Sequence, residues 1–134
     1  MVLIDLKKAF DTIQHKLLLE KLQHYGIRGW ALKWFEEYLR DREQYTEING
    51  EKSGNRRMVC GVPQGSILGP ILFLIFINDL PNAMKILTVL FADDTAMVKE
   101  GTDKAELARE LEQELNTATE WFRANKLSLN VKKN

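Results

Sequence analysis

Three aspartates in the sequence lie beside short apolar runs, an uncommon place for a charged side chain. Asp5 follows the apolar residues of "MVLID", and Asp93 and Asp94 interrupt the run "LTVLFADDTAMV". Carboxylate oxygens are ligands that Mg²⁺ prefers, and two such ions roughly 3.5–4 Å apart can activate an attacking hydroxyl and stabilise a leaving oxygen in phosphoryl transfer. This chemistry requires the carboxylates to converge at one edge of a sheet.

The adjacent pair Asp93 and Asp94 also has a structural interpretation. Aspartate hydrogen-bonds to its own backbone and tolerates tight turns, so an isolated pair is more often a turn former than a metal site. Asp5 alone is typical of a strand end. Metal binding is favoured if the strand that contains Asp5 lies beside the Asp93–Asp94 turn, because adjacent carboxylates repel each other without a cation.

Hydrophobic periodicity predicts the elements that position these acids. Apolar runs with strand character cover residues 2–6, 86–91 and 96–99, and the last two runs are joined by a tight turn over the paired aspartates. Helical spacing of apolar residues predicts amphipathic helices over 12–25 and 29–40.

Boundary signals delimit the rest of the chain. They are the turn pair Asn49-Gly50 in a hairpin over 44–63, Pro70 at the start and Pro81 at the end of an apolar buried helix, the capping pair Asp103 and Glu106 before a long helix, and Asn125 at the end of that helix. The stretch "KLSLNV" predicts a last strand. This order predicts an α+β fold, with helices packed on one face of a small antiparallel sheet.

Composition limits the class of protein. With 134 residues, of which 45% are hydrophobic, the chain suffices for one domain, and equal totals of 19 basic and 19 acidic residues give no sign of a polyanionic partner. Cys60 is the single cysteine, which is typical of a reducing intracellular setting and leaves the compartment, nuclear or cytoplasmic, open. The apolar run 71–77 is too short to span a membrane. Strand patterns at both ends predict a fragment of a longer polypeptide.

Four stretches resemble, in order and approximate spacing, the polymerase motifs A, B, C and D: "VLIDLKKAFD", "GVPQGSILGPILFLIFINDLP", "LFADDT" and "NKLSLNVKK". Together they resemble the palm of a reverse transcriptase from a non-LTR retrotransposon, over nearly all of residues 1–134. The resemblance implies an RNA-directed DNA polymerase with a palm-like fold, whose partners are an RNA template, a DNA primer and a dNTP. It implies that most of the fingers and the thumb are missing, and it leaves open an endonuclease domain elsewhere in the polypeptide.

The resemblance also implies roles for charged residues. Asp5 and Asp93 would be the principal ligands of two Mg²⁺ ions, and Asp94 a less essential one. Lys133 would assist the leaving pyrophosphate by its charge or by donating a proton. Asn134 stands where the family usually has Thr or Ser, which weakens the end of motif D.

Uncharged residues are assigned to substrate binding by the same resemblance. Phe10 matches a steric gate that leaves no room for a 2′-hydroxyl, and Gln64 and Gly65 match a loop that contacts the incoming nucleotide and the template. Each also has a plainer interpretation, because a Phe that opens a helix is usually part of a core and Gln64 alone is typical of an ordinary loop.

Two other functions stay open at the level of sequence. One is a domesticated copy that binds RNA or a protein without catalysis, and the other is a group II intron maturase. Basic residues around the hairpin alternate with acids, which is typical of a solvated surface, and His15 and His24 are too far apart to suggest a metal site. The isolated chain is expected to have little or no polymerase activity.

Overall fold

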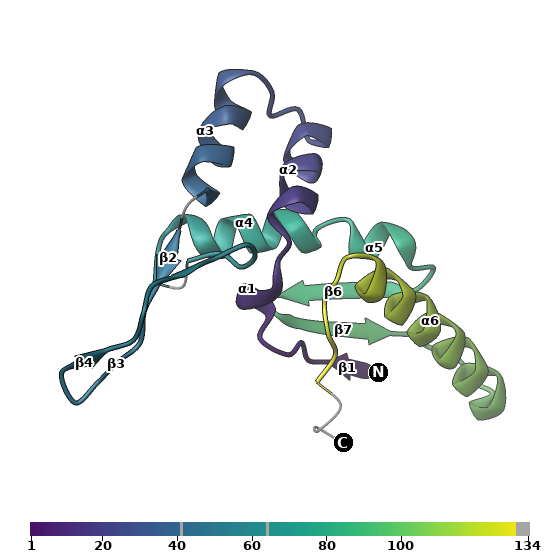
Figure 1. Cartoon of the computed structure of the whole chain (residues 1–134). Helices are drawn as coiled ribbons and strands as arrows, with labels where there is room; N and C mark the ends of the chain where they lie inside the picture. The colour runs from purple at the N-terminus through teal and green to yellow at the C-terminus, as the bar shows by residue number, and fades with distance from the viewer. Residues whose placement is uncertain (41, 64, 131–134) are drawn as a thin grey trace.

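The computed structural model describes residues 1–40, 42–63 and 65–130, and it contains a small antiparallel sheet with helices beside it (Figure 1). The sheet consists of β1 (Val2–Ile4), β6 (Leu87–Phe91) and β7 (Asp94–Val98), in the order β1-β7-β6. Because β7 pairs with both neighbours, the first residues of the chain lie beside a hairpin formed much later in the sequence. The predicted α+β fold is confirmed.

The two faces of this sheet differ in their surroundings. Successive side chains of a strand point to opposite faces, and on one face Ile4, Thr95 and Met97 are buried. They belong to the same layer as the apolar core that the helices complete. The opposite face exposes four large apolar side chains: Leu3, Leu87, Val89 and Phe91.

The central helix is α4 (Leu68–Ile77), which is followed directly by the short helix α5 (Leu80–Ala83). Leu72, Phe73 and Phe76 of α4 are fully buried, as its apolar sequence predicts. The predicted end at Pro81 is wrong, because α4 ends at Ile77 and Pro81 lies in the first turn of α5. Proline is compatible with a first turn, where its missing N–H removes no helical hydrogen bond.

The long helix α6 (Lys104–Ala124) has the boundaries that its capping residues predict. Asp103 is the N-cap, and its Oδ1 accepts a hydrogen bond from Ala105 N at 2.9 Å. Asn125 is the C-cap, and Ala118 and Phe122 bury the inner face of the helix. Contacts of α5 with both β6 and α6 connect the helix to the sheet.

The first helical region is divided in two. Of the helix predicted over 12–25, the structure forms α2 (His15–His24), because Ile13 and Gln14 are extended, with ψ near 120°. The short helix α1 (Ala9–Thr12) before them was not predicted. The helix α3 (Trp30–Leu39) agrees with its prediction, and α2 packs against both α3 and α4. In Figure 1, α2 and α3 form a pair that rises from α4, away from the sheet.

Lys21 connects three of these helices. Its Nζ donates hydrogen bonds to Phe76 O and to Asp79 Oδ1, each at 2.7 Å. The same ammonium lies 4.5 Å from the ring centroid of Phe76 and 4.6 Å from that of Trp121. Burial lowers the pKa of Lys21, although its hydrogen bond with Asp79 and the charge of that residue act in the opposite direction.

The predicted hairpin around Asn49-Gly50 is confirmed and extends away from the sheet (Figure 1). Its base pairs β2 (Glu43–Gln44) with β5 (Arg56–Arg57), and its tip pairs β3 (Glu47–Ile48) with β4 (Glu51–Lys52). Asn49 and Gly50 have φ angles of 54° and 82°. Positive φ at both central residues is typical of a type I′ turn, whose twist matches that of the strands.

The last predicted strand forms only a bridge within the described residues. Leu129 pairs with Leu6, Lys7 N donates to Ser128 O, and Asn130 N donates to Asp5 O. Lys8 has a φ of 50° and leads into α1, so the N-terminal chain turns away from this pairing after Lys7. Among the described residues, no helix is both long and apolar enough to cross a membrane.

Candidate active site

The turn between β6 and β7 carries the paired aspartates. Its two central residues are Ala92 and Asp93, because Phe91 pairs with Asp94 and closes the loop. The sequence placed both aspartates in the turn, but Asp94 is the first residue of β7. Ala92 has a φ of 51°, a conformation that costs energy for a residue with a Cβ, and this strain lies next to Asp93, one of the two acids that the resemblance makes principal ligands.

The register of β1 brings Asp5 to this turn. Ile4 pairs with Thr95, so one further step along the two antiparallel strands takes the chain to Asp5 on one side and Asp94 on the other. The strand that ends in Asp5 therefore lies beside the hairpin of Asp93 and Asp94, which is the condition that the sequence set for a shared site.

The three carboxylates differ in exposure. Asp5 and Asp93 are half-buried and Asp94 is exposed. Their oxygens are the hard donors that suit Mg²⁺, so the chemistry of the donor set fits this ion. Within the described ranges, however, no three His, Cys, Asp or Glu side chains are gathered closely enough to hold a metal ion, so the metal site stays a prediction.

Asn130 is a neighbour of the site that sequence reasoning missed. Its Nδ2 donates a hydrogen bond to Asp5 Oδ2, and its backbone N donates to Asp5 O, both at 2.9 Å. The two bonds hold the chain after α6 against the end of β1. The signal available in the sequence was the polar residue that follows the alternating stretch "KLSL".

Phe10 is held from two sides. Its side chain is half-buried, and its ring centroid lies 4.8 Å from that of Phe73 on α4. Its carbonyl oxygen accepts a hydrogen bond from Val62 N at 2.8 Å. The structure thus fixes Phe10 between the central helix and the loop that leads to Gln64, and both the core and the gate interpretations agree with this position.

The loop that contains Gln64 is anchored before and after that residue. Gly61 N donates to Ile13 O, at 2.7 Å. On the other side, Ser66 Oγ donates to Pro63 O at 2.9 Å and accepts a hydrogen bond from Gly69 N at 3.0 Å. Gly65 is exposed and has a φ of 79°, which favours glycine. Gln64 itself lies outside the described residues, as does Lys133.

A hollow of about 410 Å³ lies between this loop and the base of the hairpin. Its wall is formed by Asp11 of α1, by Arg42, Glu43 and Met58 at the base of the hairpin, and by the segment 61–63. The Nη1 atom of Arg42 is buried and has no hydrogen-bond partner in the described part of the chain. The hollow therefore has both positive and negative groups in its wall.

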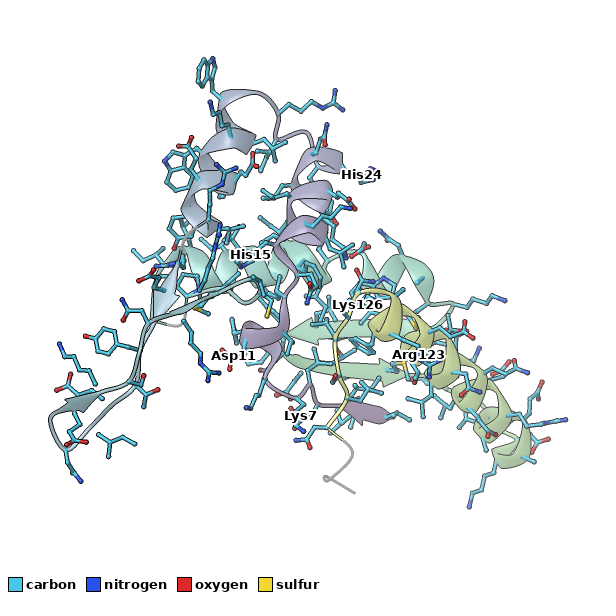
Figure 2. The ribbon with its side chains drawn as sticks, in the orientation of Figure 1. Lys7, Asp11, His15, His24, Arg123 and Lys126 are labelled. Atoms are coloured by element: carbon cyan, nitrogen blue, oxygen red, sulfur yellow. The ribbon has the colours of Figure 1, made fainter. Side chains whose placement is uncertain are left out.

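The remaining candidates from the sequence are dispersed. Figure 2 shows His15 and His24 at opposite ends of α2, in agreement with the prediction that they form no common metal site. Arg40 forms an ion pair with Glu36 at 3.1 Å, and Arg56 and Arg57 are exposed on the hairpin. This mixed charge agrees with a solvated surface.

An antiparallel sheet that brings the acid of a first strand beside an acidic hairpin has the layout of a nucleotide-polymerase palm. The chain belongs to the reverse transcriptase (RNA-dependent DNA polymerase) family, which matches residues 1–134. The family that the four motifs indicated is thereby confirmed.

Curated relatives agree with this assignment. The chain is similar to the probable RNA-directed DNA polymerase from transposon BS of Drosophila melanogaster, with 33% identity over 98% of this chain and 15% of the relative. It is 28% identical to the RNA-directed DNA polymerase from mobile element jockey of the same species, over 97% of this chain and 15% of the relative.

A third relative is the Pol polyprotein of the type-1 retrotransposable element R2 of Popillia japonica, which is 26% identical over 99% of this chain and 23% of the relative. The recognition as a reverse transcriptase of the non-LTR retrotransposon type is confirmed by these relatives. The chain spans less than a quarter of the length of each of the three.

Proposed function

We propose that this chain is the palm core of a longer RNA-directed DNA polymerase of a non-LTR retrotransposon. In the reaction, the 3′-hydroxyl of a DNA primer attacks the α-phosphate of a dNTP that is paired with an RNA template. An O–P bond forms, and pyrophosphate leaves. The observation that carries the proposal is the β1–β7 register, which brings Asp5 beside the hairpin of Asp93 and Asp94.

The acids form the reaction centre in this proposal. Asp5, Asp93 and Asp94 would hold two Mg²⁺ ions, whose chemistry is to activate the primer hydroxyl and to stabilise the leaving oxygen. The hydrogen bond from Asn130 Nδ2 to Asp5 Oδ2 would help to orient this carboxylate, because the donor favours one position of the accepting oxygen. Lys133 would stabilise the charge of the pyrophosphate.

The substrate side of the site is formed by Phe10 and the loop of Gln64 and Gly65. Phe10 would limit the space at the sugar, and the contact of its ring with the ring of Phe73 would hold it in place. Gln64 can donate and accept hydrogen bonds, so it suits a contact with the nucleotide and the template. The anchored positions of Gly61 and Pro63 support a defined approach of this loop.

Primer extension by the complete polymerase tests the proposal. The reaction contains an RNA template, a DNA primer, dNTPs and Mg²⁺, and the test variant is Asp5→Asn. We expect a loss of roughly a hundredfold or more, because several kcal/mol of charge stabilisation depend on the metal ligands. Asp103→Asn is the matched control, since asparagine also caps a helix and this residue lies at the start of α6. Extension by Asp5→Asn at the wild-type rate would refute the proposal.

A further inference from the structure

The segment 60–62, which leads to Gln64, lies across the residues that connect α1 to α2. Two backbone hydrogen bonds join the segments: Gly61 N donates to Ile13 O at 2.7 Å, and Val62 N donates to Phe10 O at 2.8 Å. Cys60 forms a bridge with Gln14 next to them. The extended break in the first helical region is thus the place where the loop is attached.

Gly61 permits this close approach. A Cβ at position 61 would lie 3.0 Å from Asp11 O and 3.1 Å from Phe10 O, closer than side chains normally come to backbone. The φ of Gly61 is also +89°, which residues with a side chain rarely adopt. The loop therefore contacts the backbone of α1 directly, with no side chain between them.

His15 forms the side-chain part of the same junction. It is the first residue of α2, is half-buried, and its Nε2 lies 2.7 Å from Gly61 O (Figure 2). A carbonyl oxygen only accepts, so His15 must carry a proton on Nε2. The neutral Nε2–H form and the imidazolium both satisfy this requirement, whereas the neutral Nδ1–H form does not.

We propose that His15 is a positioning residue that holds the Gln64 loop at a fixed separation from Phe10. The inference rests on the proposed function, in which Phe10 limits the space at the sugar and Gln64 contacts the incoming nucleotide. Gly61 is buried, so its carbonyl would otherwise lack access to water as a replacement partner. His15 acts on the nucleotide through the loop and does not touch it.

The mechanism predicts which kinetic quantity changes. Without the His15 donor, the loop keeps its two backbone bonds but gains freedom at Gly61, three residues before Gln64. Nucleotide binding and the fit at the sugar then weaken, while the carboxylates that promote the chemical step keep their places. The dNTP KM and the preference for dNTP over rNTP change more than kcat.

The test compares three variants of the complete polymerase in steady-state primer extension. His15→Leu removes the donor, His15→Gln keeps an N–H close to the position of Nε2, and His24→Leu is the matched control on the exposed end of the same helix. For His15→Leu we expect the dNTP KM to rise about threefold to tenfold, the range for loss of one hydrogen bond, with a fall of similar size in the preference for dNTP. His15→Gln should recover most of this loss, and His24→Leu should match the wild type.

Two kinetic outcomes overturn the inference. One is a His15→Leu enzyme with the wild-type KM and dNTP preference. The other is a His15→Gln enzyme that is as impaired as His15→Leu, while both variants melt at a lower temperature than the wild type. This result would indicate that the imidazole acts through packing and not through its hydrogen bond.

A second measurement separates this inference from the proposed function. Nitrogen chemical shifts of the two histidines in the 134-residue chain report which ring nitrogen carries the proton. We expect His15 to carry it on Nε2, with His24 as the internal reference. A His15 in the neutral Nδ1–H form overturns the inference whatever the activity. A wild-type polymerase that fails to extend primers refutes the proposed function, and it leaves the His15 contact to be judged by these shifts.

Discussion

Asp93 and Asp94 are neighbours in the sequence but differ in their surroundings. Asp93 occupies the turn and is half-buried, whereas Asp94 begins β7 and is exposed on the side of the sheet that the helices do not cover. Water competes less well with a half-buried carboxylate than with an exposed one for a position on a metal ion. The two residues should therefore contribute unequally to catalysis.

We predict that Asp93→Asn abolishes primer extension by the complete polymerase and that Asp94→Asn leaves more residual activity. The first change removes a principal ligand, at a cost of roughly a hundredfold or more. The assay measures extension rates at saturating dNTP over a series of Mg²⁺ concentrations. An equal loss in both variants would contradict the ranking.

Residue types singled out the three acids that we propose for the site, but not their supporting contacts. Asp5, Asp93 and Asp94 could be recognised because a carboxylate beside an apolar strand is uncommon. Asn130 and His15 could not, because the value of each depends on one hydrogen bond to a residue far away in the sequence. Asparagine and histidine are ordinary surface residues until the fold supplies the partner.

Among the elements, the loop before α4 depends on backbone approach more than on side chains. Gly26 and Gly61 have nearly equal φ angles, +95° and +89°, but only Gly61 has backbone atoms within 4 Å of an added Cβ. Alanine substitutions at Gly26 and Gly61 therefore separate the free-energy cost of the left-handed conformation from the cost of the steric contact with backbone atoms.

We predict that Gly61→Ala destabilises the chain more than Gly26→Ala. The left-handed conformation costs both variants about 1–2 kcal/mol. Gly61→Ala should lose about another 1–3 kcal/mol, because the methyl group forces the loop away from α1. Urea unfolding of the two variants and the wild type measures the difference, and equal losses would show that the loop moves away without cost.

Lys21 carries the contact between α2, α4 and α6, and burial lowers its pKa below the ordinary value of 10.5. At pH values between the lowered pKa of the folded chain and the ordinary pKa of the unfolded chain, the unfolded chain binds more protons at Lys21 than the folded chain does. The free energy of unfolding therefore rises with pH through this window.

We predict that Lys21→Met removes this contribution. The free energy of unfolding of the wild type, taken relative to that of Lys21→Met, should increase as the pH is raised from about 8 to about 10. Urea unfolding at both values measures it, with Lys16→Met as the control, because Lys16 lies on the exposed side of the same helix. A constant or falling difference would show that the pairing with Asp79 outweighs burial.

Helix periodicity predicted most elements but not the break between α1 and α2. Leu18 and Leu22 continue the helical spacing, and nothing in the local sequence opposes a helix through Ile13 and Gln14. The break follows from tertiary contacts, since Ile13 O and Gln14 bond to the segment before Gln64. The prediction that Pro81 ends a helix was wrong because proline is also compatible with the first turn of a helix.

For the whole molecule, the β1–β7 pairing joins the beginning of the chain to a hairpin formed much later in the sequence. The register places Asp5 beside the hairpin of Asp93 and Asp94, yet the chain matches at most 23% of the length of the three relatives.

We predict that the isolated chain has little or no polymerase activity, because the resemblance implies that most of the fingers and the thumb are missing. Primer extension with the purified 134-residue chain and Mg²⁺ measures this, with the complete polymerase as the positive control. Efficient extension by the chain alone would refute the prediction.

The open face of the sheet has a practical consequence for the purified chain. Leu3, Leu87, Val89 and Phe91 form exposed apolar positions on strands β1 and β6, which are both edges of the sheet. The formal net charge is zero at pH 7, so long-range repulsion between copies is weak. An exposed apolar face with weak repulsion between copies favours self-association. Solubility should thus be lowest near neutral pH, and it should improve when the pH is moved away from the sequence pI of about 6.7.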